Sequence, residues 1–229
     1  MNKILFISSS RADYGLLRNL IIETQKLNSK TYLMVTGSHL SKEYGDTFFE
    51  IKKDNIKNII KKKILDYKFS EANISNYVER TIKYTSQIIK NLKPDTLVIL
   101  GDRYELLGSA ISATVNRIPI THIHGGEVTT GAYDDSIRHA ISKLSHLHFP
   151  IHEKYKKRII QLGENPKNIF NYGGLGAESI KNINFKSRLD LEKEFKIKLN
   201  KKIFLITYHP TTLELDKSKF QILNLLSAL

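Results

Sequence analysis

The chain has no cysteine among its 229 residues and no long hydrophobic run. Without cysteine it forms no disulfide and performs no thiolate chemistry. None of its apolar runs approaches the length that crosses a bilayer. The apolar run near the N-terminus, residues 4–7, is short and is followed by Arg11 and Asp13, which favours a first β-strand over a secretory signal. These absences predict a cytoplasmic protein with no membrane partner.

Acidic residues are outnumbered, with 23 Asp and Glu against 36 Lys and Arg, so the formal net charge is +13. Nucleic-acid binding is one interpretation of such a charge. The basic runs at residues 61–63 and 154–158 do not have the repeated aromatic interleaving of a base-stacking surface. We therefore expect no nucleic-acid partner. A basic protein that handles a phosphorylated small molecule fits the charge equally well.

Short apolar runs alternate with amphipathic segments over most of the chain. The amphipathic segments predict helices at residues 14–27, 71–92, 104–116, 134–145 and 153–162. The apolar runs predict strands at residues 3–8, 31–36, 58–63, 96–100, 118–123, 147–150 and 168–172. This alternation predicts an α/β fold with a doubly wound, parallel, Rossmann-like sheet.

The character of the chain changes after residue 176. Residues 177–200 are charged and helical in pattern, residues 201–207 predict one more strand, and a helix is expected from about residue 216 to the end. A lone parallel strand cannot satisfy its hydrogen bonds or bury its faces. We therefore expect residues 1–176 to form one domain and residues 177–229 to be the start of an incomplete second one. The alternative is a segment that joins another sheet.

Polar side chains follow the first two expected strands. Arg11 and Asp13 lie where a strand, a small polar turn and a helix succeed one another, an arrangement that offers backbone N–H groups to an anion. The alternative is that Arg11 and Asp13 merely pair and cap the helix. His39 follows the second strand, at the edge where open α/β sheets bind ligands. These three residues are candidates for substrate binding.

The densest group of titratable residues lies between residues 97 and 148. Asp102 follows one expected strand, His124 and Glu127 follow the next, and Asp134 and Arg138 open the helix after that. Carboxylates that share a cleft raise one another's pKa and divide acid from base roles. Such a set suits proton abstraction and return, or the loss of an anomeric leaving group. For Asp134 and Arg138, a capped helix with an ion pair is an equally good interpretation.

Metal binding is the rival use of a histidine-rich segment. His122 and His124 lie two apart on an expected strand and so point to the same face, and His146 and His148 repeat this spacing. No HExxH pattern is present. We expect no catalytic metal, and we expect His122 to be structural.

Several motifs, taken in order along the whole chain, resemble one known family. They are SSRADYGLL (residues 9–17), VTGSHL (35–40), GDRYE (101–105), HIHGGEVTTGAYDDSIRHAISKLSHLHF (122–149), GGLG (173–176) and YHPTT (208–212). These segments are similar to the hydrolysing UDP-N-acetylglucosamine 2-epimerases of sialic-acid synthesis, and to relatives that act on UDP-diacetamido sugars. The resemblance implies a two-domain GT-B fold that binds a UDP-sugar between its domains and forms a homo-oligomer at full length. Because the family's members are longer, residues 177–229 would begin an incomplete UDP-binding domain.

The family's chemistry implies roles for the matched residues. A base removes the C2 proton of the sugar while UDP leaves C1, which gives a 2-acetamidoglycal, and water then adds with inverted configuration at C2. No nicotinamide or other cofactor is required. Asp102 and Asp134 match acid/base residues. Arg11, His39 and His209 match positions near the nucleotide and its phosphates, and Arg138 is the expected cation of the cleft.

The sequence departs from the family at one position. Some members read HIEGGE, with a functional Glu where this chain has His124. His124 is one candidate for that acid/base role, since imidazole titrates near neutral pH. Glu127, at the end of the same motif, is the other candidate. A third interpretation is that the change marks a different UDP-sugar.

Overall fold

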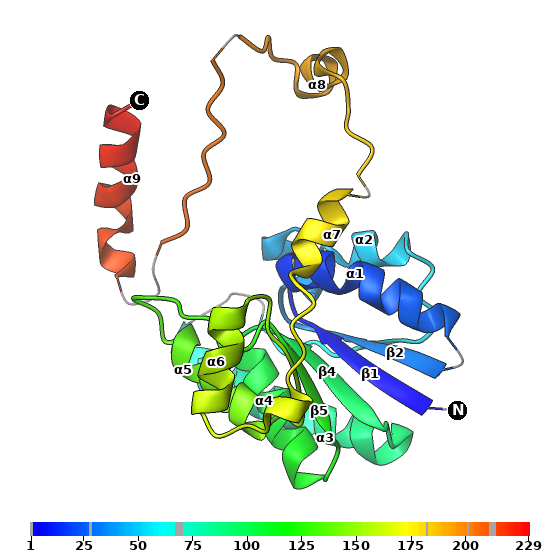
Figure 1. Cartoon of the computed structure of the whole chain (residues 1–229). Coiled ribbons are helices and arrows are strands. Elements are labelled where there is room, and N and C mark those ends of the chain that lie inside the picture. Colours follow the sequence, from blue (N-terminus) through cyan, green and yellow to red (C-terminus); the bar gives the residue numbers. More distant parts are fainter. Residues whose placement is uncertain (1, 28, 67–70, 182, 201, 211–213) are drawn as a thin grey trace.

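The computed structural model describes residues 2–27, 29–66, 71–181, 183–200, 202–210 and 214–229 (Figure 1). Within them, six strands form one parallel sheet in the order β3-β2-β1-β4-β5-β6. The strands are β1 (Asn2–Ser8), β2 (Ser29–Val35), β3 (Ile59–Lys61), β4 (Thr96–Leu100), β5 (Ile120–Ile123) and β6 (Leu147–Phe149). The chain builds outward from β1 to β3 and then returns to β4 and builds outward to β6. The predicted doubly wound α/β fold is confirmed.

Helices cover both faces of the sheet (Figure 1). Helices α3 (Ile74–Leu92), α4 (Tyr104–Val115) and α5 (Asp134–Leu144) pack on one face. Helix α1 (Arg11–Lys26) and the short helix α2 (Phe48–Lys52) pack on the other. Helix α6 (Glu153–Gln161) follows β6. The sheet is therefore the middle layer of three, as expected of parallel strands that are apolar on both faces.

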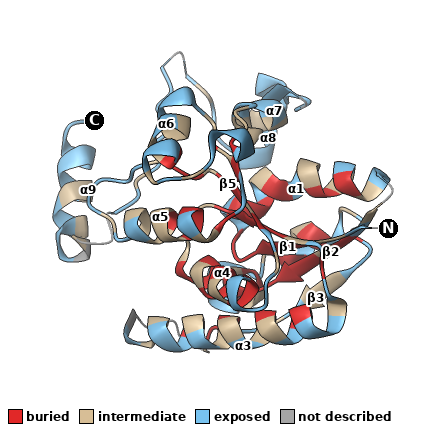
Figure 2. Ribbon diagram, turned by 60° about the horizontal axis from the view of Figure 1, so that its bottom comes forward, coloured by how far each residue is buried: buried red, intermediate tan, exposed pale blue. Residues whose placement is uncertain are grey.

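Alternate residues of the central strands divide between the two layers of core. Leu5 of β1 and Leu97 of β4 face the layer that contains α3, α4 and α5, whereas Phe6 and Val98 face α1 and α2. Figure 2 shows the buried sheet between these two layers of half-buried helices. None of the helices among the described residues is both long enough and apolar enough to span a membrane.

The predicted strand at residues 201–207 is wrong. Lys201 lies outside the described residues, and residues 202–210 have no regular secondary structure. Apolar side chains in this stretch are exposed, and Leu205 is 95% exposed. A strand is completed by hydrogen bonds to a neighbour, and the described residues offer this segment none.

Two other expectations needed smaller corrections. The strand predicted at residues 168–172 is reduced to an isolated bridge between Ile169 and His148. Asp134 was expected as a possible N-cap of α5, but Tyr133 occupies that position and Asp134 is the first helical residue. A carboxylate in the first helical turn still interacts favourably with the helix dipole.

Three further helices complete the described chain: α7 (Leu175–Lys181), α8 (Arg188–Phe195) and α9 (Ser218–Ser227). Helix α7 lies against α1, where Asn19 Nδ2 donates to Ser179 Oγ at 3.4 Å. Helices α8 and α9 contain no buried residue and stand off from the sheet (Figure 1). The domain boundary predicted at residue 176 falls in the first turn of α7 and stays a prediction.

Candidate active site

The carboxyl ends of β1, β4 and β5 lie at one edge of the sheet. Strands β1 and β4 are neighbours, and the chain reverses its direction of building between them. This is the topological switch point, where open α/β sheets form a ligand-binding crevice. The turns that leave β4 and β5 contain Asp102, His124 and Glu127, and the turn after β1 leads directly into Arg11 and Asp13 of α1. The topology therefore brings residues from distant parts of the chain together.

The centre of this edge is an ion pair between Asp102, after β4, and Arg138, on α5. The Arg138 guanidinium donates to the Asp102 carboxylate and also to Thr129 Oγ1, the latter at 3.2 Å. The side chain of Arg138 is 9% exposed and that of Asp102 is 20% exposed. A pair with so little exposure holds its geometry more firmly than an ion pair at the surface.

The Asp102 carboxyl has a raised pKa. Burial is the largest cause, since the charged form is disfavoured away from water. The Arg138 charge opposes the rise, whereas the negative charges of Asp134 and Glu127 add to it. Two of the predicted catalytic carboxylates, Asp134 and Glu127, therefore act electrostatically on a third, Asp102, as does the positive charge of Arg138. Their proximity agrees with the expected convergence of the strand ends, and their acid/base roles stay predictions.

His124 lies beside Glu127 in the turn after β5. The distance from His124 Nδ1 to Glu127 Oε1 is 2.9 Å. His124 has a left-handed backbone with φ of 64°, and its N–H donates to the Phe149 carbonyl at 3.1 Å. Non-glycine residues seldom adopt this conformation, and those that do cluster at functional sites. Both candidates for the third acid/base role therefore share one microsite.

Asp13 and His39 support the turn after β1 rather than line an open cleft. The Asp13 carboxylate accepts hydrogen bonds from the Ser9 and Ser10 backbone N–H groups, and Asp13 forms a capping box with Ser10. His39 is completely buried, with Nε2 2.8 Å from Ser8 Oγ and Nδ1 2.7 Å from Thr47 Oγ1. Burial lowers the pKa of His39. The capping interpretation holds for Asp13, but its expected partner Arg11 lies elsewhere.

The other predicted binding residues are exposed. Arg11 pairs with Glu50 of α2 at 3.2 Å, and its side chain is 74% exposed. His209 is exposed within residues 202–210. The Thr211 and Thr212 positions of the same motif lie outside the described residues. The structure thus places Arg11 at the carboxyl edge of the sheet, but it does not pack His209 against that edge.

Two residues of the site were not singled out from the sequence. Arg103 follows Asp102 directly, and its guanidinium donates to Glu105 Oε1 at 3.0 Å. Glu105 is completely buried, and burial is the largest cause of its raised pKa. Both residues belong to the GDRYE motif, so the motif itself was the available signal. Glu105, beneath the turns after β1 and β4, thus forms a second ion pair at this edge.

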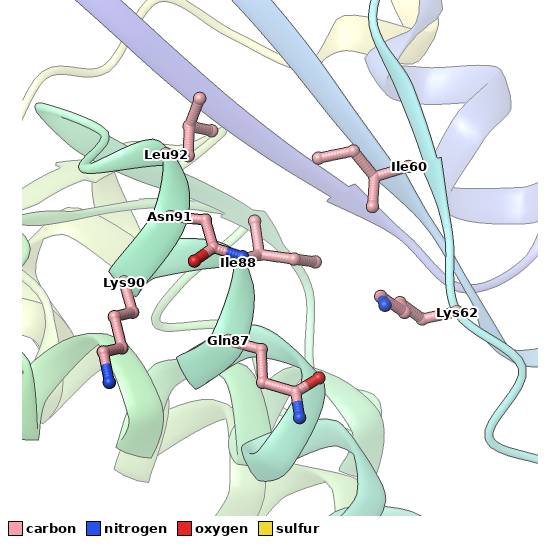
Figure 3. Close-up of a pocket in the computed structure, with 7 residues that line it drawn as sticks. All are labelled: Ile60, Lys62, Gln87, Ile88, Lys90, Asn91 and Leu92. Atoms are coloured by element: carbon pink, nitrogen blue, oxygen red, sulfur yellow. The ribbon is translucent and has the colours of Figure 1, made fainter.

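A groove of about 440 Å³ lies elsewhere, between β3 and the C-terminal part of α3 (Figure 3). It is lined by Ile60, Lys62, Gln87, Ile88, Lys90, Asn91 and Leu92. It contains no carboxylate or histidine. Among the described residues no group of three or more His, Cys, Asp or Glu side chains is arranged to hold a metal ion. The carboxyl edge of the sheet is therefore the candidate active site.

Known proteins resemble this chain in sequence over nearly its whole length. A GDP/UDP-N,N'-diacetylbacillosamine 2-epimerase (hydrolyzing) of Campylobacter jejuni is 46% identical over 99% of this chain and 59% of its own length. A UDP-N,N'-diacetylbacillosamine 2-epimerase (hydrolyzing) of Legionella pneumophila is 35% identical over all of this chain and 60% of its own length. The chain thus spans about six tenths of the length of these relatives.

Solved structures show the same fold. UDP-GlcNAc 2-epimerase from Neisseria meningitidis, bound to UDP-GlcNAc, matches with a TM-score of 0.68 and 21% identity over 85% of this chain and 51% of that one. UDP-N-acetylglucosamine 2-epimerase from Rickettsia bellii matches with a TM-score of 0.69 and 20% identity over 86% of this chain and 52% of that one.

A family model described as UDP-N-acetylglucosamine 2-epimerase matches residues 22–229. That range includes the turns after β4 and β5 and the whole of α5, which contain the carboxylates of the candidate site. Since the match covers most of the chain, and relatives of 46% and 35% identity cover it almost completely, the chain belongs to the UDP-N-acetylglucosamine 2-epimerase family.

Proposed function

We propose that the protein to which this chain belongs is a hydrolysing UDP-sugar 2-epimerase. It converts a UDP-linked 2-acetamido sugar to UDP and the free sugar with inverted configuration at C2. The observation that carries the proposal is the cluster of Asp134, Glu127 and Arg138 around Asp102 at the switch point. A site that removes a proton from carbon and later returns one requires several carboxylates in different protonation states.

The reaction has two steps that the cluster can support. In the first, a carboxylate takes the proton from C2, the C2–H electron pair forms the C1–C2 double bond, and UDP departs from C1 with the bonding pair. In the second, water adds its hydroxyl at C1, and C2 receives a proton on the opposite face. The raised pKa of Asp102 moves this carboxyl toward the range in which it both gives and takes a proton. Arg138 holds it in place.

The substrate that we favour is a UDP-2,4-diacetamido sugar. The two relatives compared above are both named as hydrolyzing enzymes for N,N'-diacetylbacillosamine linked to a nucleotide. UDP-GlcNAc is the second candidate, since the family takes its name from that sugar. The presence of His124, where some members of the family have Glu, supports the first choice as a mark of a different sugar. Cytoplasmic location and a homo-oligomeric assembly belong to the same proposal.

A chimera tests the proposal. Residues 1–176 of this chain replace the corresponding part of the Campylobacter relative, so that the candidate site stands in a protein of the relative's full length. The chimera is incubated with UDP-N,N'-diacetylbacillosamine or with UDP-GlcNAc, in ordinary water and in D₂O. We expect UDP and a free sugar with deuterium at C2. Release of an intact, epimerised UDP-sugar would instead assign a non-hydrolysing reaction.

Two variants show whether this chain's residues perform the chemistry. Asp102→Asn should lower kcat at least about 100-fold, the usual contribution of a general acid or base. Asp95→Asn is the matched control, because Asp95 precedes the opposite end of the same strand and binds the Lys3 backbone N–H at 2.7 Å. Equal activity of the two variants would refute the assignment of Asp102. The 229-residue chain alone is expected to turn over poorly, because the resemblance places most uridine-binding groups in the part that only the relatives contain.

A further inference from the structure

His122 of β5 lies beneath the candidate site and contacts the residue after β4, helix α5 and the turn after β5. The side chain is completely buried. Its Nε2 is 2.8 Å from the Gly101 carbonyl oxygen, and its Nδ1 is 3.1 Å from Ser142 Oγ. Both ring nitrogens are therefore occupied by partners from two other elements, the end of β4 and helix α5.

Both partners are directly connected to catalytic candidates. Gly101 is the residue before Asp102. Ser142 lies four residues after Arg138 and eight after Asp134, so these three side chains share one face of α5. The ring thus joins the strand end that carries Asp102 to the helix face that carries its ion-pair partner.

The ring also packs against the turn after β5. A Cβ atom added at Gly125 would lie 3.0 Å from His122 Nδ1 and 2.9 Å from Ser142 Oγ. Gly125 stands between His124 and Glu127 in the turn. The turn that carries both candidates for the third acid/base role is therefore in contact with the same imidazole.

The partners determine the protonation state of the ring. A carbonyl oxygen only accepts, so Nε2 carries the hydrogen and Nδ1 accepts from the Ser142 hydroxyl. Burial lowers the pKa of His122 to about 3, and the nearby His148, Arg138 and His124 lower it as well, against the bond to the Gly101 carbonyl, which raises it. The imidazole is thus neutral near pH 7, and in that state its Nδ1 accepts from the Ser142 hydroxyl while its Nε2–H donates to the Gly101 carbonyl.

We propose that His122 is a positioning residue: its neutral Nε2–H tautomer fixes the distance between Asp102 and the face of α5 that carries Arg138 and Asp134. This inference rests on the proposed function, because the distance matters to the reaction only if Asp102 and Asp134 act as proposed. It goes beyond that function because it gives a role to a completely buried residue that acts through its neighbours. A shift of the β4 end relative to α5 would weaken the proton transfer without removing any catalytic group.

The kinetic test compares two serine-to-alanine variants in the chimera. Ser142→Ala removes the hydroxyl that binds the ring. Ser112→Ala is the control, because it removes another completely buried serine hydroxyl, one that is 2.8 Å from Ser86 Oγ between α4 and α3. Each change should lower Tm by about 2–4 °C. Only Ser142→Ala should lower kcat, by about tenfold with KM little changed. Equal kcat in the two variants would overturn the proposal.

Substitutions of the histidine provide a rescue test. In His122→Gln the side-chain amide nitrogen reaches approximately the place of Nε2, so the bond to Gly101 survives. In His122→Asn the amide reaches only the place of Nδ1. Because the Gln side chain has no counterpart of Nδ1, we expect the Gln variant to lose about tenfold in kcat, as Ser142→Ala does, and the Asn variant to lose about 100-fold. Equal losses in both would contradict the assigned role of the Nε2–H.

An NMR test on the 229-residue chain is independent of turnover. The His122 ring should give the signals of a neutral Nε2–H tautomer from pH 5 to pH 8. The pKa of Asp102, followed by its ¹³C carboxyl signal, should move by about half a pH unit in Ser142→Ala and not in Ser112→Ala. If the chimera is inactive, the proposed function fails while this test still decides the positioning role. A protonated ring, or the same Asp102 titration in both variants, would overturn it.

Discussion

Removing the positive charge of Arg138 should destabilise the fold in a way that depends on pH. In Arg138→Met the hydrocarbon part of the side chain is largely kept, but Asp102 is left without its partner. Burial and the negative charges of Asp134 and Glu127 already raise the Asp102 pKa, and only Arg138 provides a strong opposing effect. The substitution should therefore raise that pKa further.

The size of the effect follows from the burial of the pair. Two unit charges about 4 Å apart attract by about 4 kcal/mol at an effective dielectric constant of about 20. Removing one partner of a buried ion pair costs about 3–5 kcal/mol. Because the Asp102 side chain is 20% exposed, water screens part of the uncompensated charge. We therefore expect a loss at the lower end, about 3 kcal/mol at pH 7.

The sign of the pH dependence is determined by the raised pKa. A carboxyl whose folded pKa lies above its unfolded value contributes stability below the unfolded pKa and loses that contribution as pH rises through the folded value. In Arg138→Met the Asp102 carboxyl is largely protonated near pH 4, so the penalty for an unpaired buried charge is small there. The loss relative to the parent should grow from about 1 kcal/mol at pH 4 to about 3 kcal/mol at pH 7.

Urea unfolding of the 229-residue chain at both pH values measures these differences. The double variant Asp102→Asn/Arg138→Met should be more stable at pH 7 than Arg138→Met alone, because it contains no unpaired buried charge. The reasoning is refuted if Arg138→Met costs the same at pH 4 and pH 7. It is also refuted if the double variant is no more stable than the single one.

Two further predictions concern the neighbouring turns. Gly37→Ala should destabilise the chain by about 3 kcal/mol, because its Cβ would lie 2.4 Å from the Ser9 carbonyl oxygen at a backbone φ of 57°. Gly15→Ala, with no atom within 4 Å of the added Cβ, should stabilise α1 by about 0.5–1 kcal/mol, and urea unfolding that ranks the two the other way would contradict this. In the chimera, His124→Gln and Glu127→Gln should each lower kcat about 100-fold, with no further loss in the double variant since the two act as a unit. Free-sugar release between pH 6 and pH 9 measures these rates, and parental kcat in either single variant would assign the role to the other residue alone.

The positions of the carboxylates of the candidate site were predictable because they depend on local pattern and topology. A short apolar run that ends in Gly101 and Asp102 reads as a buried strand with a polar residue at its carboxyl end. Parallel strands align these ends at one edge, so Asp102 and Glu127 could be expected near each other before any contact was known. Asp134 could be expected near them because it begins the next helix in the chain.

The expectations that failed depended on long-range partners. Residues 202–207 have the composition of a strand, but a strand needs a neighbour, and composition does not supply one. His39 was expected at a ligand because it follows a strand, yet its ring is completely buried between Ser8 and Thr47. Whether a polar side chain at a strand end faces the cleft or the core depends on how neighbouring turns pack.

By itself, the sequence determined the order of strands and helices, the doubly wound class and the edge of the sheet at which the candidate site lies. These features follow from hydrophobic periodicity and chain direction, which are local properties. Only the tertiary structure decided that Asp13 caps a helix, that Arg138 pairs with Asp102 and that the imidazole of His122 connects β4 to α5. The longest of those contacts, between Asp102 and Arg138, joins residues 36 positions apart. These contacts form only when the chain is folded, because burial excludes water and each buried polar group then bonds to the protein groups around it.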